Sequence, residues 1–149
     1  MLKNIDPVLT PDLLKALAEM GHDDAVVLAD ANFTGETLAA RYLIRLPGIG
    51  LLRTLQAVVS VLPLATDEPH PVGFMQVAGS APDYASGLQR EAIAALAAGG
   101  IRPDQCEPVE RFAFYERTRE AFLIVQTGEL QPYANFILRK GVIGEALRP

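Results

Sequence analysis

The sequence predicts a single α/β domain over residues 1–149, with helices on both faces of a mostly parallel or mixed sheet (a three-layer α/β/α arrangement). A chain of 149 residues has the length of one domain. Half of the residues are hydrophobic and 21% are charged, which favours a packed core over disorder. Apolar runs of strand length alternate with segments of helical periodicity, the pattern that is typical of α/β folds.

The first expected helix begins after Thr10, which suits the N-cap position, and it has a proline in its first turn. Gly21 is expected to end this helix. The run "AVVLA" (25–29) contains no polar residue, so we expect a strand that is covered on both faces. In the helix that begins after Thr10, the apolar residues share one face: Leu13, Leu14, Leu17 and Met20.

Two further helices are expected in the middle of the chain. Residues 50–62 place their leucines and valines in a wide apolar stripe, and Pro63 ends this stretch. Residues 85–100 are rich in alanine and finish with two glycines. The remaining strands are expected at residues 72–78, 109–114, 122–127 and 135–142, with a short helical turn at 115–121.

Composition excludes several classes of function. The net charge is −5 and Lys and Arg do not cluster, so nucleic acid is not an expected partner. No apolar stretch approaches the ~20 residues of a membrane span and no signal-type segment opens the chain, so we expect a cytoplasmic protein without a membrane partner. The single cysteine, Cys106, excludes an intramolecular disulfide. Zinc spacing, a phosphate loop and a dinucleotide fingerprint are missing, so these motifs assign no metal or nucleotide site.

Two polar residues stand at the ends of apolar elements and are candidates for chemistry. His22 follows the expected helix end, where it could cap the helix when protonated or act as an acid near neutral pH. Asp30 ends the first strand, where ligands collect in open α/β sheets, but the sequence Asp-Ala-Asn also suits an Asx turn. The pattern leaves both alternatives open for each residue. The second histidine, His70, lies between two prolines and is expected to be solvated.

The last third of the chain combines polar and aromatic side chains. The segments "RFAFYERTR" and "QPYANF" supply Arg111, Tyr115, Tyr133 and Asn135. Guanidinium, phenol and amide groups are typical of sites that bind sugar hydroxyls. Each residue alone fits a solvent-exposed turn equally well, so together they only suggest a polyol site.

Three longer blocks are more specific: "MLKNIDPVLTPDLLKALAEMGHDDAVVLADANF", "RFAFYER" and "YANFILRKGV". They resemble the sugar-mutarotase family of fucose mutarotase and ribose pyranase, and the fucose type more closely. The resemblance extends from Met1 to about Val142. It implies an enzyme that interconverts the α and β anomers of a free monosaccharide without metal or organic cofactor. It also implies a ring-like homo-oligomer, commonly a decamer, with sites at subunit contacts.

The resemblance also assigns roles to individual residues. His22 corresponds to the catalytic histidine, and Tyr115 is a weaker candidate for handling the second proton. Arg111 favours fucose-type over ribose-type activity. The residues that would bind the sugar are Asp30, Arg111, Tyr133 and Asn135.

Two positions depart from the family pattern. A "YGN" motif reads Tyr133-Ala134-Asn135 here, and Thr34 stands where proline is frequent. If position 134 required a positive φ, alanine would be strained there. These departures motivate two alternatives, namely a non-catalytic sugar-binding or regulatory oligomer and a ribose pyranase-type activity.

Overall fold

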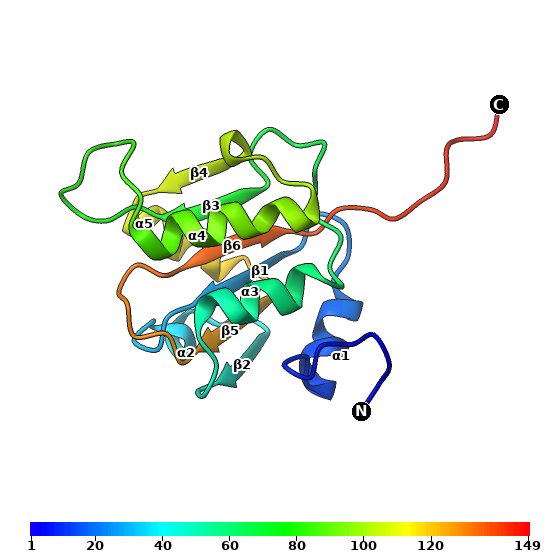
Figure 1. Ribbon diagram of the computed structural model, residues 1–149, viewed down its shortest axis with the longest axis horizontal. Coiled ribbons are helices and arrows are strands. Elements are labelled where there is room, and N and C mark those ends of the chain that lie inside the picture. The colour runs from blue at the N-terminus through cyan, green and yellow to red at the C-terminus, as the bar shows by residue number, and fades with distance from the viewer.

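The computed structural model describes residues 1–149 and forms a six-stranded mixed sheet with helices on both faces (Figure 1). This confirms the predicted three-layer α/β class. None of its helices combines the length and apolar character needed to cross a membrane. In chain order the elements are α1 (Pro11–Glu19), β1 (Ala25–Ala29), α2 (Gly35–Leu38), β2 (Tyr42–Leu46), α3 (Leu51–Val59), β3 (Val72–Met75), α4 (Gly87–Ala95), the 3-10 helices η1 (Leu96–Gly99) and η2 (Pro103–Gln105), β4 (Cys106–Val109), α5 (Arg111–Arg119), β5 (Leu123–Thr127) and β6 (Phe136–Arg139).

Strand direction defines the two edges of the sheet. The strand order is β2-β5-β1-β6-β3-β4. Only β6 is antiparallel to its neighbours, β1 and β3, and the other strands run in one direction. The arrows of β2, β4 and β5 therefore all point toward the left in Figure 1. We call the edge where β1 to β5 end and β6 begins the carboxyl edge, and the opposite one the amino edge.

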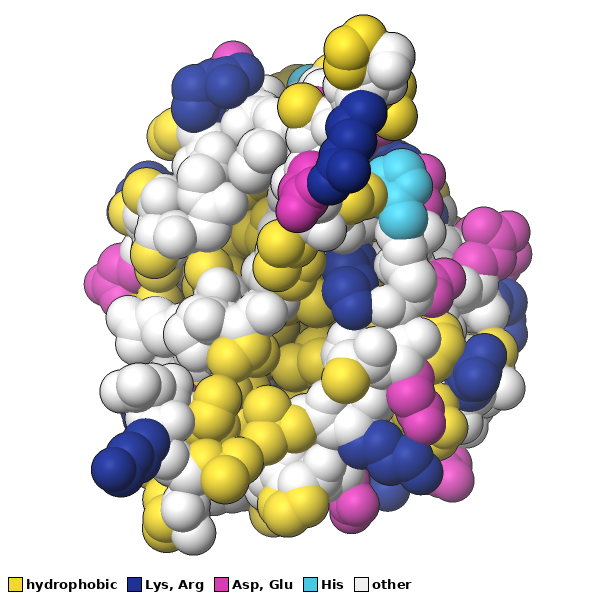
Figure 2. Space-filling view, turned by 90° about the vertical axis from the view of Figure 1, so that its right-hand side faces the viewer, with side chains coloured by type: hydrophobic (Ala, Val, Ile, Leu, Met, Phe, Trp, Pro, Cys, Tyr) yellow, Lys and Arg dark blue, Asp and Glu magenta, His cyan; other side chains and the backbone are white.

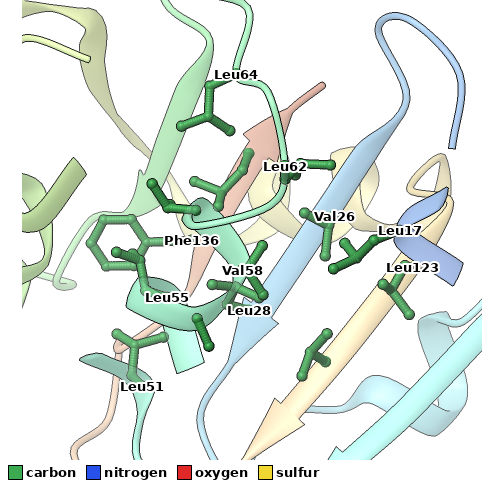
Figure 3. Close-up of a cluster of buried hydrophobic side chains, with 14 of the residues drawn as sticks. Leu17, Val26, Leu28, Leu51, Leu55, Val58, Leu62, Leu64, Leu123 and Phe136 are labelled. Carbon is green, nitrogen blue, oxygen red and sulfur yellow. The ribbon is translucent and has the colours of Figure 1, made fainter. Parts of the chain in front are cut away.

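Two apolar clusters cover the two faces of the sheet. Successive strand side chains point to opposite faces, so Val26 and Leu28 of β1 join a cluster with α1, α3 and α4. Val27 and Ala29 join a second cluster with α2 and α5. Figure 3 shows the first cluster, packed between α3 and the sheet. All four side chains are fully buried, which confirms that β1 is covered on both faces.

Helix α1 begins as predicted, but the turn that ends it differs in conformation from the expected one. The Thr10 hydroxyl accepts a hydrogen bond from the Leu13 N–H at 3.2 Å, which is the expected N-cap. The helix ends at Glu19, and Gly21 does not adopt a left-handed conformation. The left-handed residue of the turn is Asp23, with φ of 69°. An aspartate tolerates this region better than most residues. The helix thus ends just before Gly21, as expected, but without a left-handed glycine.

Residues 109–114 do not form the predicted strand. The Glu110 carboxylate instead accepts hydrogen bonds from the N–H groups of Phe112 (2.9 Å) and Ala113 (3.1 Å), and this cap starts α5. The alternation of phenylalanines was therefore misleading. Phe112 is 61% exposed, whereas Phe114 is buried against the second cluster. The short helical turn predicted after this segment is the rest of α5.

Other boundaries differ for simple reasons. β2 was not predicted because it is an edge strand of half-exposed residues interrupted by Arg45, and α2 has only four residues. β3 ends at Met75 rather than at residue 78. α3 ends at Val59, ahead of Pro63. α4 ends at Ala95, after which the chain tightens into η1.

An apolar groove lies on the face that carries α1. Leu14 and Leu17 of α1 line it opposite Val61 and Leu62, which follow α3. Figure 2 shows a hollow lined by hydrophobic side chains on this side of the molecule. The last residues of the chain extend away from the body in Figure 1 and expose Ile143.

The loop after β5 allows a test of the packing at the carboxyl edge. A side chain at Gly128 would overlap the backbone of Pro47, whose carbonyl carbon lies 2.8 Å from the position of its Cβ. We expect Gly128→Ala to lower the free energy of unfolding by about 1–3 kcal/mol, measured by urea denaturation. Gly48→Ala is the control, because a Cβ at Gly48 meets nothing within 4 Å. Equal stabilities of the two variants would contradict this account.

Candidate functional site

A buried pair of polar side chains joins β1 to β6 at the carboxyl edge. Leu28 lies opposite Phe136 in the antiparallel ladder, so the next residues outward bring Asp30 to Asn135. The Asp30 N–H donates to Asn135 Oδ1 at 2.8 Å, and Asn135 Nδ2 donates to Asp30 Oδ2 at 3.0 Å. The residues are 5% and 2% exposed. This reciprocal pair fixes the carboxylate and the amide at one place.

The second carboxylate oxygen of Asp30 organises the loop that follows. Asp30 Oδ1 accepts a hydrogen bond from the Asn32 N–H at 2.9 Å, which is the Asx turn that the sequence allowed. Gln126 of β5 then donates to the carbonyl oxygens of Ala31 (3.0 Å) and Phe33 (2.8 Å). The turn and a site role are compatible, because the turn uses one acceptor position of a carboxylate that has about four.

The surroundings of Asp30 change its acidity. Burial raises the pKa of this carboxyl above its usual value, and the nearby charge of Glu129 acts in the same direction. Hydrogen bonds from Asn135, Asn32 and Phe33 oppose that shift by stabilising the carboxylate. The net result is a raised pKa, so the folded protein disfavours the charged form of Asp30.

Tyr133 has an unusual backbone conformation for a bulky residue. Its φ is 63°, in the left-handed region, which costs of order 1–3 kcal/mol in residues other than glycine. Ala134 is 1% exposed and has no positive φ. The change from glycine to alanine in the "YGN" motif therefore adds a buried methyl group without backbone strain. The strained position of the motif is the tyrosine.

Arg111 and Tyr115 lie on α5, farther along the same edge. Arg111 begins the helix, is exposed, and places its guanidinium 4.7 Å from the centre of the Phe112 ring. It lines a hollow of about 310 Å³ together with the segment that follows β3. The half-buried Tyr115 ring packs 5.8 Å from Phe33, near the Asp30 loop. Arg111 follows β4, which is three strands from β1 in the sheet, so α5 begins beside a different strand from the one that ends at Asp30.

Two glutamines, the buried Gln89 and the partly buried Gln126, support this edge and were not predicted. Gln126 holds the loop after Asp30, and Gln89 of α4 donates to the carbonyl oxygen of Tyr133 at 2.9 Å. The only signal in the sequence was an amide inside an apolar or alanine-rich segment. Because the partner of Gln89 is 44 residues away, local pattern could not identify it.

His22 lies at the opposite, amino edge of the sheet. Its side chain is exposed and makes no hydrogen bond within the chain. The carbonyl groups at the end of α1 are instead bound by Lys140, whose ammonium donates to Leu17 O at 2.9 Å and Met20 O at 2.5 Å. A lysine therefore caps this helix by hydrogen bonds, and His22 makes none to its carbonyl groups.

The length of β1 separates His22 from Asp30 within one chain. The five steps from Ala25 to Asp30 span ~17 Å at ~3.3 Å per residue, and His22 lies beyond Ala25. The structure thus brings Asp30, Asn135 and Tyr133 together and places the α5 residues along the same edge. It does not bring His22 to them.

Cys106 is not a candidate nucleophile. Burial, reinforced by the charge of Asp104, raises the pKa of the Cys106 thiol to about 11, so the thiol stays protonated at neutral pH. No group of three or more His, Cys, Asp or Glu side chains is arranged to hold a metal ion.

Comparison with known proteins identifies the family. Residues 3–143 match the family described as the RbsD / FucU transport protein family. The chain belongs to this family. It is 43% identical to the L-fucose mutarotase of Glaesserella parasuis, over 95% of this chain and 96% of the relative. It is 42% identical to the fucose mutarotase of Homo sapiens, over 99% and 97% of the two chains.

Solved structures of the RbsD / FucU family share the fold closely. The fucose mutarotase of Streptococcus pneumoniae, whose crystal structure contains L-fucose, superimposes with a TM-score of 0.88 at 36% identity. The match covers 96% of this chain and all of the other.

The raised pKa of Asp30 gives a prediction about stability. Its protonated form is favoured by folding, so the stability that Asp30 contributes is full below its ordinary pKa, 3.8, and is lost as the pH rises through the higher folded value. We therefore expect wild type to lose stability relative to Asp30→Asn as the pH rises from about 3.5 to 7. Urea unfolding of both proteins at several pH values measures this difference.

The matched control for this experiment is Asp67→Asn, since Asp67 is exposed. Its stability difference from wild type should not show the decline seen for Asp30. If the difference in free energy of unfolding between wild type and Asp30→Asn does not change with pH, or if wild type becomes relatively more stable as the pH rises, the pKa of Asp30 is not raised by folding.

Proposed function

We propose that this chain is a sugar mutarotase that interconverts the α and β anomers of L-fucose or a closely related free monosaccharide. The names of its relatives support the activity and the sugar. The observation that carries the proposal is the buried carboxylate–amide pair of Asp30 and Asn135 beside Tyr133. A set of fixed acceptors and donors with an adjacent phenol suits the binding of sugar hydroxyls.

The reaction asks little of the protein. A proton leaves the anomeric hydroxyl, a proton reaches the ring oxygen, and the ring opens to the aldehyde. Rotation about C1–C2 and the reverse transfers then close the ring to the other anomer. One positioned acid–base group typically accelerates such a step ~10²- to 10⁴-fold. Catalysis therefore requires a bound sugar and a side chain that can give and take protons near neutral pH.

The carboxyl edge supplies the holding groups. Asp30 Oδ1 accepts from Asn32 and Oδ2 accepts from Asn135, and the remaining acceptor capacity of the carboxylate is available to a sugar hydroxyl. The Tyr133 phenol and the Asn135 amide approach from the loop before β6. We assign the remaining hydroxyls to Arg111 of α5, and Tyr115 of the same helix is a further proton donor or sugar contact.

His22 is the proposed acid–base, and in this proposal it comes from a second copy of the chain. Its own Asp30 is at the other end of β1, farther than one pyranose ring can bridge. Two exposed hydrophobic residues, Phe112 (61%) and Leu130 (77%), lie at the carboxyl edge. Apolar side chains at such exposure fit a subunit contact. We propose that copies associate head to tail in a closed ring, a decamer, with each site shared between neighbours.

The departures from the family pattern do not favour the alternatives. Ala134 is unstrained and leaves the Asp30–Asn135 pair intact. Thr34 precedes α2, whose first turn is closed by the Leu38 N–H bonding to the Thr34 carbonyl at 3.2 Å. Neither residue removes a group that the reaction needs, so a non-catalytic role gains no support from them.

Removal of the imidazole tests the catalytic assignment. We expect His22→Ala to slow the exchange of L-fucose anomers by about 10²-fold or more, because the acid–base is lost while the exposed side chain contributes little to the fold. Saturation-transfer NMR measures the exchange rate directly. His70→Ala is the control for the other histidine and should retain wild-type exchange. Undiminished exchange in His22→Ala would overturn the assignment.

Mixed oligomers test whether the site is shared. His22→Ala and Asp30→Ala should each be inactive alone, whereas co-expressed copies should regain about one quarter of the wild-type activity. This fraction follows because a complete site needs an intact His22 from one copy and an intact Asp30 from its neighbour, each present in half of the copies. Recovery near zero in a confirmed mixed oligomer would mean that both residues act within one chain.

A further inference from the structure

Gln89 is a fully buried amide in α4, an alanine-rich helix that packs on one face of the sheet. It is 0% exposed, and its three hydrogen bonds satisfy the amide oxygen and nitrogen. Gln89 Oε1 accepts from the Ser86 N–H at 2.9 Å. Its Nε2 donates to the carbonyl oxygens of Met75 (2.7 Å) and Tyr133 (2.9 Å). One side chain thus connects the start of α4, the end of β3 and the loop before β6.

The bond to Tyr133 falls on the strained residue of the site loop. Left-handed backbone in a bulky residue persists only where surrounding contacts enforce it. Gln89 provides the one hydrogen bond to the Tyr133 carbonyl oxygen. On the other side, the Met75 N–H donates to the Asn135 carbonyl at 3.0 Å. Gln89 also binds Met75. Met75 therefore anchors Asn135, the last residue of the Tyr133-Ala134-Asn135 motif.

We infer that Gln89 is a positioning residue of the sugar site. Its amide holds Tyr133 in the left-handed conformation and thereby directs the phenol, and the Asn135 amide behind it, toward the substrate. This inference rests on the proposed mutarotase function. Gln89 itself touches no substrate, because it is buried beneath the loop.

The competing explanation is that Gln89 only stabilises the fold. It belongs to a capping box, since Ser86 Oγ also accepts from the Gln89 N–H at 3.2 Å. Removal of the amide would lower stability in either case. A test must therefore separate the loss of a buried amide from the loss of the Tyr133 conformation.

The chain contains a matched control at Gln105. This residue is 2% exposed, and its Oε1 accepts from the Arg102 N–H at 3.0 Å. Its Nε2 donates to the carbonyl oxygens of Thr66 (2.9 Å) and Glu68 (3.0 Å). The arrangement repeats that of Gln89 bond for bond, but it supports a loop that contains none of the site residues.

The experiment compares Gln89→Met with Gln105→Met in the full-length protein. Methionine has similar length and no amide, so both variants should lose stability to a similar extent in urea denaturation. We expect Gln89→Met alone to raise the KM for L-fucose about 5- to 30-fold, as loss of one or two such bonds does. Its kcat should stay within about twofold of wild type, because the binding contact is lost equally from ground and transition states.

Each outcome is decisive. An unchanged KM in Gln89→Met, or an equal rise in Gln105→Met, would overturn the positioning role while leaving the mutarotase function standing. Wild type without accelerated exchange would overturn the proposed function itself, and the inference with it. If Gln89→Met does not fold, Gln89→Asn replaces it. The shorter amide cannot reach both carbonyl groups, and Gln105→Asn is then its control.

Discussion

The reciprocal hydrogen bonds between Asp30 and Asn135 are the constraint on which the rest of the carboxyl edge depends. They join strands whose residues lie 105 positions apart. They form because β6 is antiparallel to β1, so its first residue lies where β1 ends. With both groups buried, loss of either partner leaves the other unsatisfied at a cost of about 1–3 kcal/mol. The pair therefore determines where the loops on either side can lie.

Glutamine amides, rather than regular structure, shape the loops around this pair. Gln126 holds the segment after Asp30, and Gln89 holds the segment before Asn135. Each donates to two carbonyl groups that no helix or strand satisfies. This arrangement allows an irregular backbone, including the strained Tyr133, to remain fixed at the end of a regular sheet. Rigid presentation of polar groups is what recognition of a small sugar requires.

Local pattern predicted the layers and the central strand well, because both follow from apolar periodicity. It failed at α5, since Phe112 and Phe114 fit a strand as readily as a helix until the capping role of Glu110 is known. It also missed Gln89, because its partners are distant in the sequence. The roles of His22 and Asp30 came from family resemblance. The distance between His22 and Asp30, however, could be predicted from the sequence, because the two residues flank opposite ends of the predicted strand 25–29.

The position of His22 and Asp30 at opposite ends of β1 has a consequence for assembly. If every site is shared between neighbours, an open row of copies always has an unfinished half-site at each end, so n copies complete only n − 1 sites. Closing the row completes all n. Function alone would then favour a ring over any open chain, and the length of one five-residue strand would be the reason.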